Sequence, residues 1–166
     1  KASGTSSSSK EKISPASCRT VYDSLKPNLT GTKSATVDRD YQASKLGPFV
    51  GVTLTSYTET PATGVFDDLA HALSTCPKFT STSSKGAKTS YTVAPLKFPN
   101  LGDQTFAMRM TITSKSGPFT LKMTADVAMA TKVAASVAVV NAGLGKLFLP
   151  STSLTAMKAA LAGLPG

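Results

Sequence analysis

The sequence predicts an α+β fold in which a twisted antiparallel β-sheet (a meander) is packed by two or three helices. Three successive apolar runs lie between residues 105 and 140, and short connections join them, which is typical of antiparallel neighbours. Before and after these runs, apolar residues recur at helical spacing. The length of 166 residues favours one domain around one core.

The chain opens with a stretch of serine, glycine and lysine that has no apolar side chains to bury. We therefore expect residues 1–13 to form a flexible tether and residues 14–166 to form a single sensor-like domain. A tether of this kind is typical of a surface lipoprotein, or of the external domain of a membrane protein just after its anchor. An ordinary frayed terminus is the alternative.

The first helix is predicted to begin at Ser14-Pro15, with serine as the N-cap and proline at the first helical position. Lys26-Pro27 ends it. Its apolar face consists of four residues at helical spacing: Cys18, Val21, Tyr22 and Leu25.

A second helix is predicted from Thr63 to Cys76, where Pro77 ends it. Asp67 and Asp68 lie in its first turn, where carboxylates interact favourably with the helix dipole. Its apolar stripe contains Phe66, Leu69, Ala70 and Leu73.

The two cysteines, Cys18 and Cys76, lie on these two helices. An even pair of cysteines in a chain rich in serine and threonine suggests a disulfide formed in an oxidising compartment outside the cytoplasm. Two free buried thiols of a cytosolic protein are the alternative.

Strands are predicted where the apolar period changes to two. The Phe106–Ile112 and Phe119–Met129 runs alternate with polar residues, and Val133–Val140 is more uniformly apolar, as expected of a central strand covered on both faces. Further strands are predicted at Val50–Leu54 and in a hairpin through Tyr91 and Val93, and Asp38-Arg39-Asp40 fits a solvated strand edge. A C-terminal helix through Leu154, Met157, Ala160, Leu161 and Leu164 is capped by Ser151 or Ser153 and ended by Gly163 and Pro165.

The charge pattern excludes several classes of function. The net charge is +9, but the lysines are spread along the chain without a run of three, so no nucleic-acid partner is expected. His71 is the only histidine, and a metal site needs more ligands than it and the cysteines provide, so neither a metal nor a cofactor is expected. A secreted hydrolase that uses His71 is the enzymatic alternative.

These observations predict a non-enzymatic, extracytoplasmic domain, a monomer that meets a membrane only through an N-terminal anchor. Its expected partner is a small molecule or an anionic component of the cell envelope, and a cationic protein that adheres to the cell wall is the second alternative. Tyr57, Arg109 and Lys122 are the exposed strand positions that we expect to contact a ligand.

The order of elements also resembles a known family. The helix end Leu73-Ser74-Thr75-Cys76-Pro77-Lys78-Phe79, the hairpin through Tyr91-Thr92-Val93, the run Ala134–Gly143 and the final Leu/Ala helix are similar to the extracellular sensor domain of the mycobacterial kinase PknH and to related actinobacterial lipoproteins. The resemblance covers most of the chain after Ser14. It implies a twisted antiparallel sheet with helices beside a cleft, no enzyme activity and a presumed ligand, and it transfers no functional residue to this chain.

Overall fold

In the part of the chain that the structure describes, the sheet contains eight antiparallel strands. A computed structural model describes residues 11–24, 33–42, 44, 47–58, 65–144 and 150–163. The strands are β1 (Lys12–Ser14), β2 (Lys33–Gln42), β3 (Phe49–Tyr57), β4 (Lys78–Thr82), β5 (Lys88–Pro95), β6 (Gln104–Ser116), β7 (Phe119–Lys132) and β8 (Ala135–Leu144). The helices are η1 (Ala16–Cys18, a 3₁₀ turn), α1 (Arg19–Ser24), α2 (Val65–Thr75) and α3 (Pro150–Ala162).

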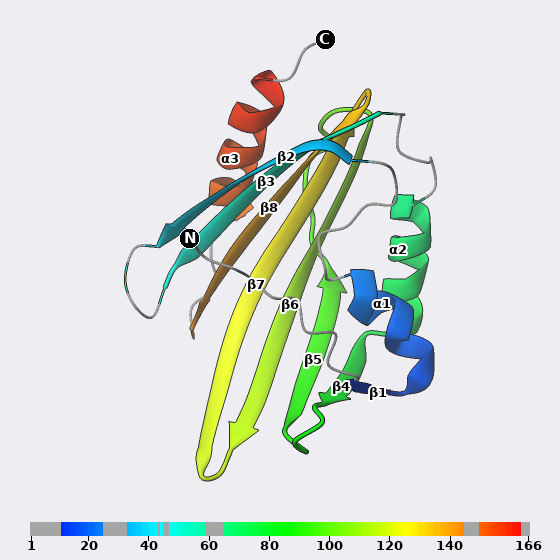
Figure 1. The fold of residues 1–166 in the computed structure, drawn as a ribbon, viewed down its shortest axis with the longest axis vertical. Helices are drawn as coiled ribbons and strands as arrows, with labels where there is room; N and C mark the ends of the chain where they lie inside the picture. Colours follow the sequence, from blue (N-terminus) through cyan, green and yellow to red (C-terminus); the bar gives the residue numbers. More distant parts are fainter. Residues whose placement is uncertain are drawn as a thin grey trace.

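The strand order is β1-β4-β5-β6-β7-β8-β3-β2 (Figure 1). Strands β4 to β8 are neighbours in sequence and in space, so the predicted meander is confirmed and is longer than expected. Strand β3 lies beside β8, and β2 pairs with β3 at the edge of the sheet. The predicted α+β class is therefore confirmed in outline, with more sheet than helix.

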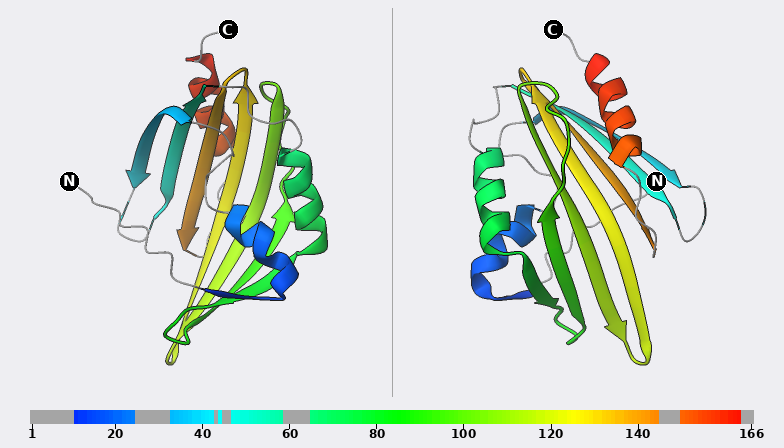
Figure 2. Two further views of the ribbon diagram at one scale, coloured as in Figure 1. Left: turned by 45° about the vertical axis from the view of Figure 1, so that its right-hand side comes forward. Right: turned by 180° about the vertical axis from the view of Figure 1, so that it is seen from behind.

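Helices cover both faces of the sheet (Figure 2). Helices α1 and α2 lie on one face, which we call the α1/α2 face, and α3 lies on the other, the α3 face. Successive side chains of a strand point to opposite faces, so each strand contributes alternate residues to each side. The α1/α2 face of the central strands is mostly apolar, and the α3 face combines small and apolar residues with polar ones such as Arg109 and Asp126.

The larger core lies between the sheet and the α1/α2 pair. Cys18 and Val21 of the first helical segment are almost completely buried there, as is Met108 of β6. The disulfide between Cys18 and Cys76 joins the end of η1 to the residue after α2, with 5.5 Å between the two Cα atoms. The predicted bridge is thus present, and it holds the two helices against the sheet.

The smaller core lies under α3. Met157 is fully buried and packs on apolar side chains of β6, β7 and β8. These partners are small, which lets the helix approach the sheet closely. They are Ala107, Ala128, Ala130, Val137 and Val139.

Several predicted boundaries are wrong. Ser14 does not cap a helix, because it ends β1 and pairs with Thr80 of β4. Ser151 and Ser153 lie inside α3 rather than before it, and Gly163 follows the helix as predicted. Val133 lies in the turn between β7 and β8.

Strand β1 begins at Lys12, inside the segment expected to be a tether, and the first ten residues of that segment lie outside the described residues. The predicted end of the first helix at Leu25, Lys26 and Pro27 also lies outside them, as do Leu164 and Pro165.

Candidate functional site

A pocket opens on the α1/α2 face where β3, β8 and β7 lie side by side. Its cavity volume is about 20 Å³, which is room for about one water-sized group, and its mouth is open to solvent. Its walls are Thr53, Thr55 and Tyr57 of β3, Met129 of β7, and Ser136, Val137 and Ala138 of β8. The lining thus combines four hydroxyl groups with apolar carbon and contains no charged side chain.

Strand alternation and register bring these hydroxyls together. Thr55 pairs with Ser136 across β3 and β8, and both side chains are buried on the same face. The hydroxyl groups of Tyr57 and Ser136 lie 3.3 Å apart and share a hydrogen bond. Thr53 donates to the carboxylate of Asp38 on the edge strand over 2.7 Å. Each hydroxyl can donate or accept, so the pocket suits a small uncharged molecule with polar groups.

Tyr57 was expected to be an exposed strand residue, and this is wrong. Its side chain is only 6% exposed. The residue ends β3, and its backbone N–H donates to Ala134 O in the turn before β8. Tyr57 lines the pocket, which keeps it a candidate ligand contact, although for a reason different from the exposure that we expected.

Arg109 and Lys122 lie on the opposite side of the sheet, the α3 face. The Arg109 guanidinium donates two hydrogen bonds of 2.7 Å to the buried carboxylate of Asp126. The hydrogen bond to Asp126 raises the pKa of Arg109. Lys122 is exposed on the same face of β7, four residues and about 13 Å along the strand from Asp126. The three predicted ligand contacts therefore do not meet in one site.

A buried amide lies beside the Arg109–Asp126 pair. Asn141 of β8 is directly opposite Asp126 of β7, and it is completely buried with neither amide atom hydrogen-bonded. The hydroxyl of Ser153, in the first turns of α3, is also buried without a partner. This polar cluster lies under α3, and no pocket described here opens onto it.

Lysine and hydroxyl side chains occupy the part of the α3 face that α3 itself does not cover. Helix α3 contacts β7, β8 and β3, which leaves β1, β4 and β5 open on this side (Figure 2). The lysines that the sequence spreads over separate segments thus come together on one surface. These lysines are Lys12, Lys78, Lys88, Lys115 and Lys122, and the hydroxyls between them are Ser14, Thr80, Thr82, Ser90, Thr92, Thr111, Thr113 and Thr120.

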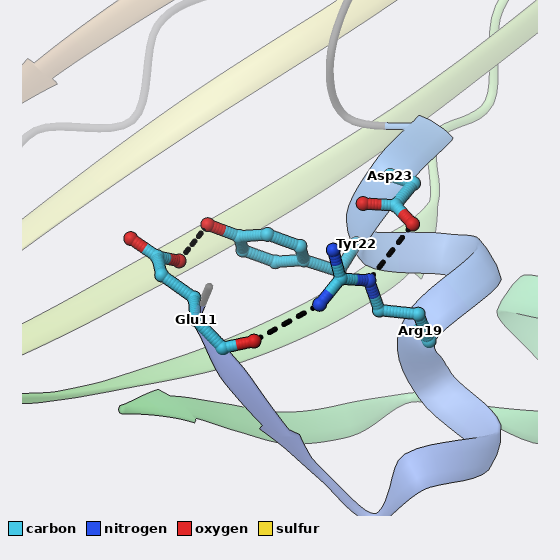
Figure 3. Close-up of polar contacts among 4 residues, drawn as sticks. All are labelled: Glu11, Arg19, Tyr22 and Asp23. Atoms are coloured by element: carbon cyan, nitrogen blue, oxygen red, sulfur yellow. Dashed lines mark hydrogen bonds and ion pairs between the residues drawn. The ribbon is translucent and has the colours of Figure 1, made fainter. Parts of the chain in front are cut away.

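Polar contacts fix the first helical segment beside the disulfide (Figure 3). Arg19 donates to the Asp23 carboxylate over 2.8 Å and to the backbone carbonyl of Glu11 over 2.9 Å. The Tyr22 hydroxyl donates to the Glu11 carboxylate, and its ring packs edge-on against Phe79 and Tyr91. Burial and the bond to Glu11 raise the pKa of Tyr22 above its usual value. This cluster holds the helical layer in place.

His71 does not take part in a catalytic arrangement with the pocket. It lies exposed on α2, and the pocket lining contains neither a histidine nor a carboxylate. Asp67, one turn away, is also exposed. Within the described ranges, no three His, Cys, Asp or Glu side chains are grouped so that they could hold a metal ion.

Sequence reasoning missed Thr55, Ser136, Asp126 and Asn141. Ser136 and Asn141 interrupt an otherwise apolar run, and a polar residue in a strand covered on both faces is the signal that could have identified them. Thr55 gives no such signal, because threonine is common in strands.

The comparisons with known proteins support the fold. No protein-family model and no curated protein sequence matches the chain. In the described part of the chain, none of the helices is both long enough and apolar enough to span a membrane. A solved structure, the extracellular domain of PknH from Mycobacterium tuberculosis, superimposes with a TM-score of 0.61 at 15% sequence identity, over 94% of this chain and 79% of that chain. This protein therefore has the fold of the extracellular domain of PknH.

Proposed function

We infer that this protein is a non-enzymatic, extracytoplasmic, sensor-like domain that binds a small uncharged molecule in the pocket beside Tyr57. The observation that carries the proposal is the convergence of the Thr53, Thr55, Tyr57 and Ser136 hydroxyls on one cavity, with Met129 as the apolar wall. Clefts that combine an apolar wall with a few placed polar groups are the usual form of small-molecule sites.

The chemistry of the lining favours binding over catalysis. General acid–base or nucleophilic catalysis needs an activating base within hydrogen-bond reach of the reacting group. The lining residues are neutral hydroxyl, aliphatic and thioether side chains, which can orient a ligand. The nearby carboxylate of Asp38 is not part of the lining, and it accepts the hydrogen bond of Thr53 on the exposed edge strand β2. The cavity has room for about one water-sized group, so the proposed ligand is a neutral molecule that places a single hydroxyl or methyl group in the pocket and keeps its other atoms at the open mouth.

Two observations support a location outside the cytoplasm. The Cys18–Cys76 disulfide persists in oxidising compartments, and thiols in the cytosol are kept reduced. The fold is also that of a domain described as extracellular. Lipid anchoring remains part of the proposal. The location is tested by mass spectrometry of the protein isolated from its own cells without reductant. Two free thiols, or recovery of the protein in the cytosolic fraction, would contradict it.

The ligand proposal is tested by saturation-transfer NMR with glycerol and a panel of neutral monosaccharides. We expect saturation to pass from the wild-type chain to at least one probe. Tyr57→Phe and Ser136→Ala should each weaken that signal, because each removes one hydroxyl and leaves the pocket shape nearly unchanged. The matched control is Tyr41→Phe, since Tyr41 is 62% exposed on β2 and lies outside this pocket. Equal signals for all three variants would exclude the pocket as the binding site.

A further inference from the structure

We propose that the end of the sheet formed by the β6–β7 hairpin binds directly to a membrane surface rich in anionic lipid. In this arrangement Phe119 and Leu121 enter the boundary between headgroups and acyl chains, and nearby lysines contact the lipid phosphates. The inference uses residues outside the Tyr57 pocket, so it does not depend on the ligand proposed there.

The hairpin projects beyond the rest of the sheet. Residues 115–122 pair only with one another in the described sheet, because β5 ends its pairing at Thr89 opposite Ser114, and β8 ends at Leu144 opposite Met123. Figure 1 shows the tip of the hairpin extending past every other element at that end of the molecule. The two-residue turn Gly117-Pro118 is therefore the part of the sheet best placed to reach a flat surface first.

One side of this projecting hairpin is apolar and solvent-exposed. Phe119 is 77% exposed and Leu121 is 55% exposed. They are two residues apart on β7, so their side chains lie on the same face, about 7 Å from each other along the strand. A large aromatic and a large aliphatic side chain left together in water at a projecting tip indicate a surface that is covered in the functional state.

The other side of the hairpin is basic. Lys115 pairs with Thr120, and Lys122 lies diagonally across from Lys115 on the same face, at a separation of about 7–8 Å. Lys85 and Lys88, in and after the β4–β5 turn, lie at the same end of the sheet (Figure 1). All four lysines are exposed.

Strands β4, β5, β6 and β7 carry no acidic residue at this end of the sheet. Between residues 78 and 125 the sequence contains six lysines, Arg109 and a single acid, Asp103. Asp103 is at the opposite end of the sheet, where its carboxylate accepts from the Val133 N–H. The hairpin end therefore carries lysines on one side and two exposed apolar side chains on the other, and Glu11, which precedes β1 at this end of the sheet, accepts the Tyr22 hydroxyl.

The layers of an anionic bilayer match the apolar and basic side chains at this end of the sheet. Phenylalanine and leucine are favourable in the zone below the headgroups, and lysine ammonium groups on long apolar stems reach the phosphate level above it. The negative potential of an anionic leaflet attracts each lysine near the surface. Several lysines combined with two apolar side chains supply the two signals that stable peripheral binding requires.

Vesicle sedimentation tests this. The disulfide-bonded chain is mixed with vesicles of phosphatidylcholine alone, or of phosphatidylcholine with phosphatidylglycerol. We expect binding to the phosphatidylglycerol vesicles that weakens at high salt, and little binding to phosphatidylcholine. Phe119→Ser with Leu121→Ser should lower the partition coefficient by about tenfold or more. The control is Val37→Ser with Tyr41→Ser, because these β2 side chains are 49% and 62% exposed and lie away from the tip.

The lysines are tested in the same assay. Lys115→Gln with Lys122→Gln should weaken binding by about fivefold for each lysine removed. Lys97→Gln with Lys158→Gln is the matched control, since both residues are exposed outside the hairpin end. Far-ultraviolet circular dichroism and a thiol count establish that every variant is folded.

Insertion itself is tested with a fluorescent reporter. The chain contains no tryptophan, so Phe119→Trp introduces a single one. Its emission should shift to shorter wavelength on phosphatidylglycerol vesicles, and that of Tyr41→Trp should not. The proposal is overturned if the wild-type chain binds neither vesicle. It is also overturned if the Phe119→Ser/Leu121→Ser variant binds as tightly as the wild type, which would mean adsorption to negative charge alone, or if the tip variant changes only the oligomeric state.

Discussion

Arg109 and Asp126 form a doubly hydrogen-bonded ion pair across β6 and β7, with both N–O distances at 2.7 Å. The Asp126 side chain is only 2% exposed, whereas that of Arg109 is 27% exposed. The carboxylate is therefore withdrawn from water and depends on the guanidinium for its charge compensation.

Arg109→Met should lower the free energy of unfolding by about 3 kcal/mol, because it leaves a buried carboxylate without its cation. Urea denaturation at neutral pH measures the change. The double variant Arg109→Met/Asp126→Leu should recover most of the lost stability, since it removes both charges and keeps the volume. Equal stability of the single and double variants would show that the pair does not act as a unit.

Removal of the disulfide should destabilise the fold strongly. The bridge closes a loop between residues separated by 58 positions, which corresponds to about 4 kcal/mol in the chain-entropy model. Cys18→Ala/Cys76→Ala should therefore unfold at much lower urea concentration. The slope of the transition should also steepen as the unfolded chain becomes less compact. An unchanged midpoint would show that packing of Val21, Leu69 and Leu73 alone holds the helices.

Tyr22 should make stability fall at alkaline pH. Burial and the hydrogen bond to Glu11 raise the pKa of Tyr22 in the folded state above its unfolded value of about 10. Its contribution is therefore fully present below pH about 10 and is lost as the pH rises toward the folded-state pKa. Unfolding measured from pH 7 upward should show the wild type losing its advantage over Tyr22→Phe above that point. Lysine deprotonation affects the wild type and Tyr22→Phe alike, so the difference in stability between them reports on Tyr22. A stability difference that stays constant with pH would contradict the assignment.

Ser153→Ala should stabilise the protein. The Ser153 hydroxyl is fully buried and has no hydrogen-bond partner, which costs about 1 kcal/mol or more relative to an apolar atom. Alanine also has the higher helix propensity, so Thr155→Ala, at an exposed position of α3, serves as the control for that effect. Thermal unfolding should show a larger gain for Ser153→Ala than for the control. A loss of stability would mean that the hydroxyl has an essential partner.

Much of the fold follows from local periodicity, because the β6 and β7 alternation and the α2 stripe are long and regular. The Arg109–Asp126 pair was also within reach of the sequence. A two-residue turn at Gly117-Pro118 fixes the register of the hairpin, and that register places Asp126 opposite Arg109.

The remaining features depend on contacts far apart in sequence. Nothing local places β3 beside β8, and the three residues of β1 are too few for a periodic signal. The sequence predicts that Tyr57 is an exposed strand residue. That inference fails at Tyr57 because β3 pairs with β8, whose Ser136 contacts the Tyr57 hydroxyl on this face. The prediction that Ser14 caps a helix fails for a similar reason, because the pairing of β1 with β4 fixes the backbone conformation of Ser14.

Gly102 should be the least replaceable of the described glycines. Its φ angle is +70°, and a Cβ at this position would lie 2.2 Å from the backbone carbonyl oxygen of Thr131. That carbonyl cannot move freely, because it accepts a 2.7 Å hydrogen bond from the Asp103 N–H. Gly102→Ala should therefore destabilise the protein by clearly more than the roughly 1 kcal/mol expected from backbone conformation alone. Gly117→Ala is the matched control, because Gly117 also has a positive φ of +59° but a Cβ there meets no atom within 4 Å. Urea denaturation of the two variants separates collision from conformational strain, and equal losses of stability would mean that the backbone of β7 at Thr131 moves to accommodate the methyl group.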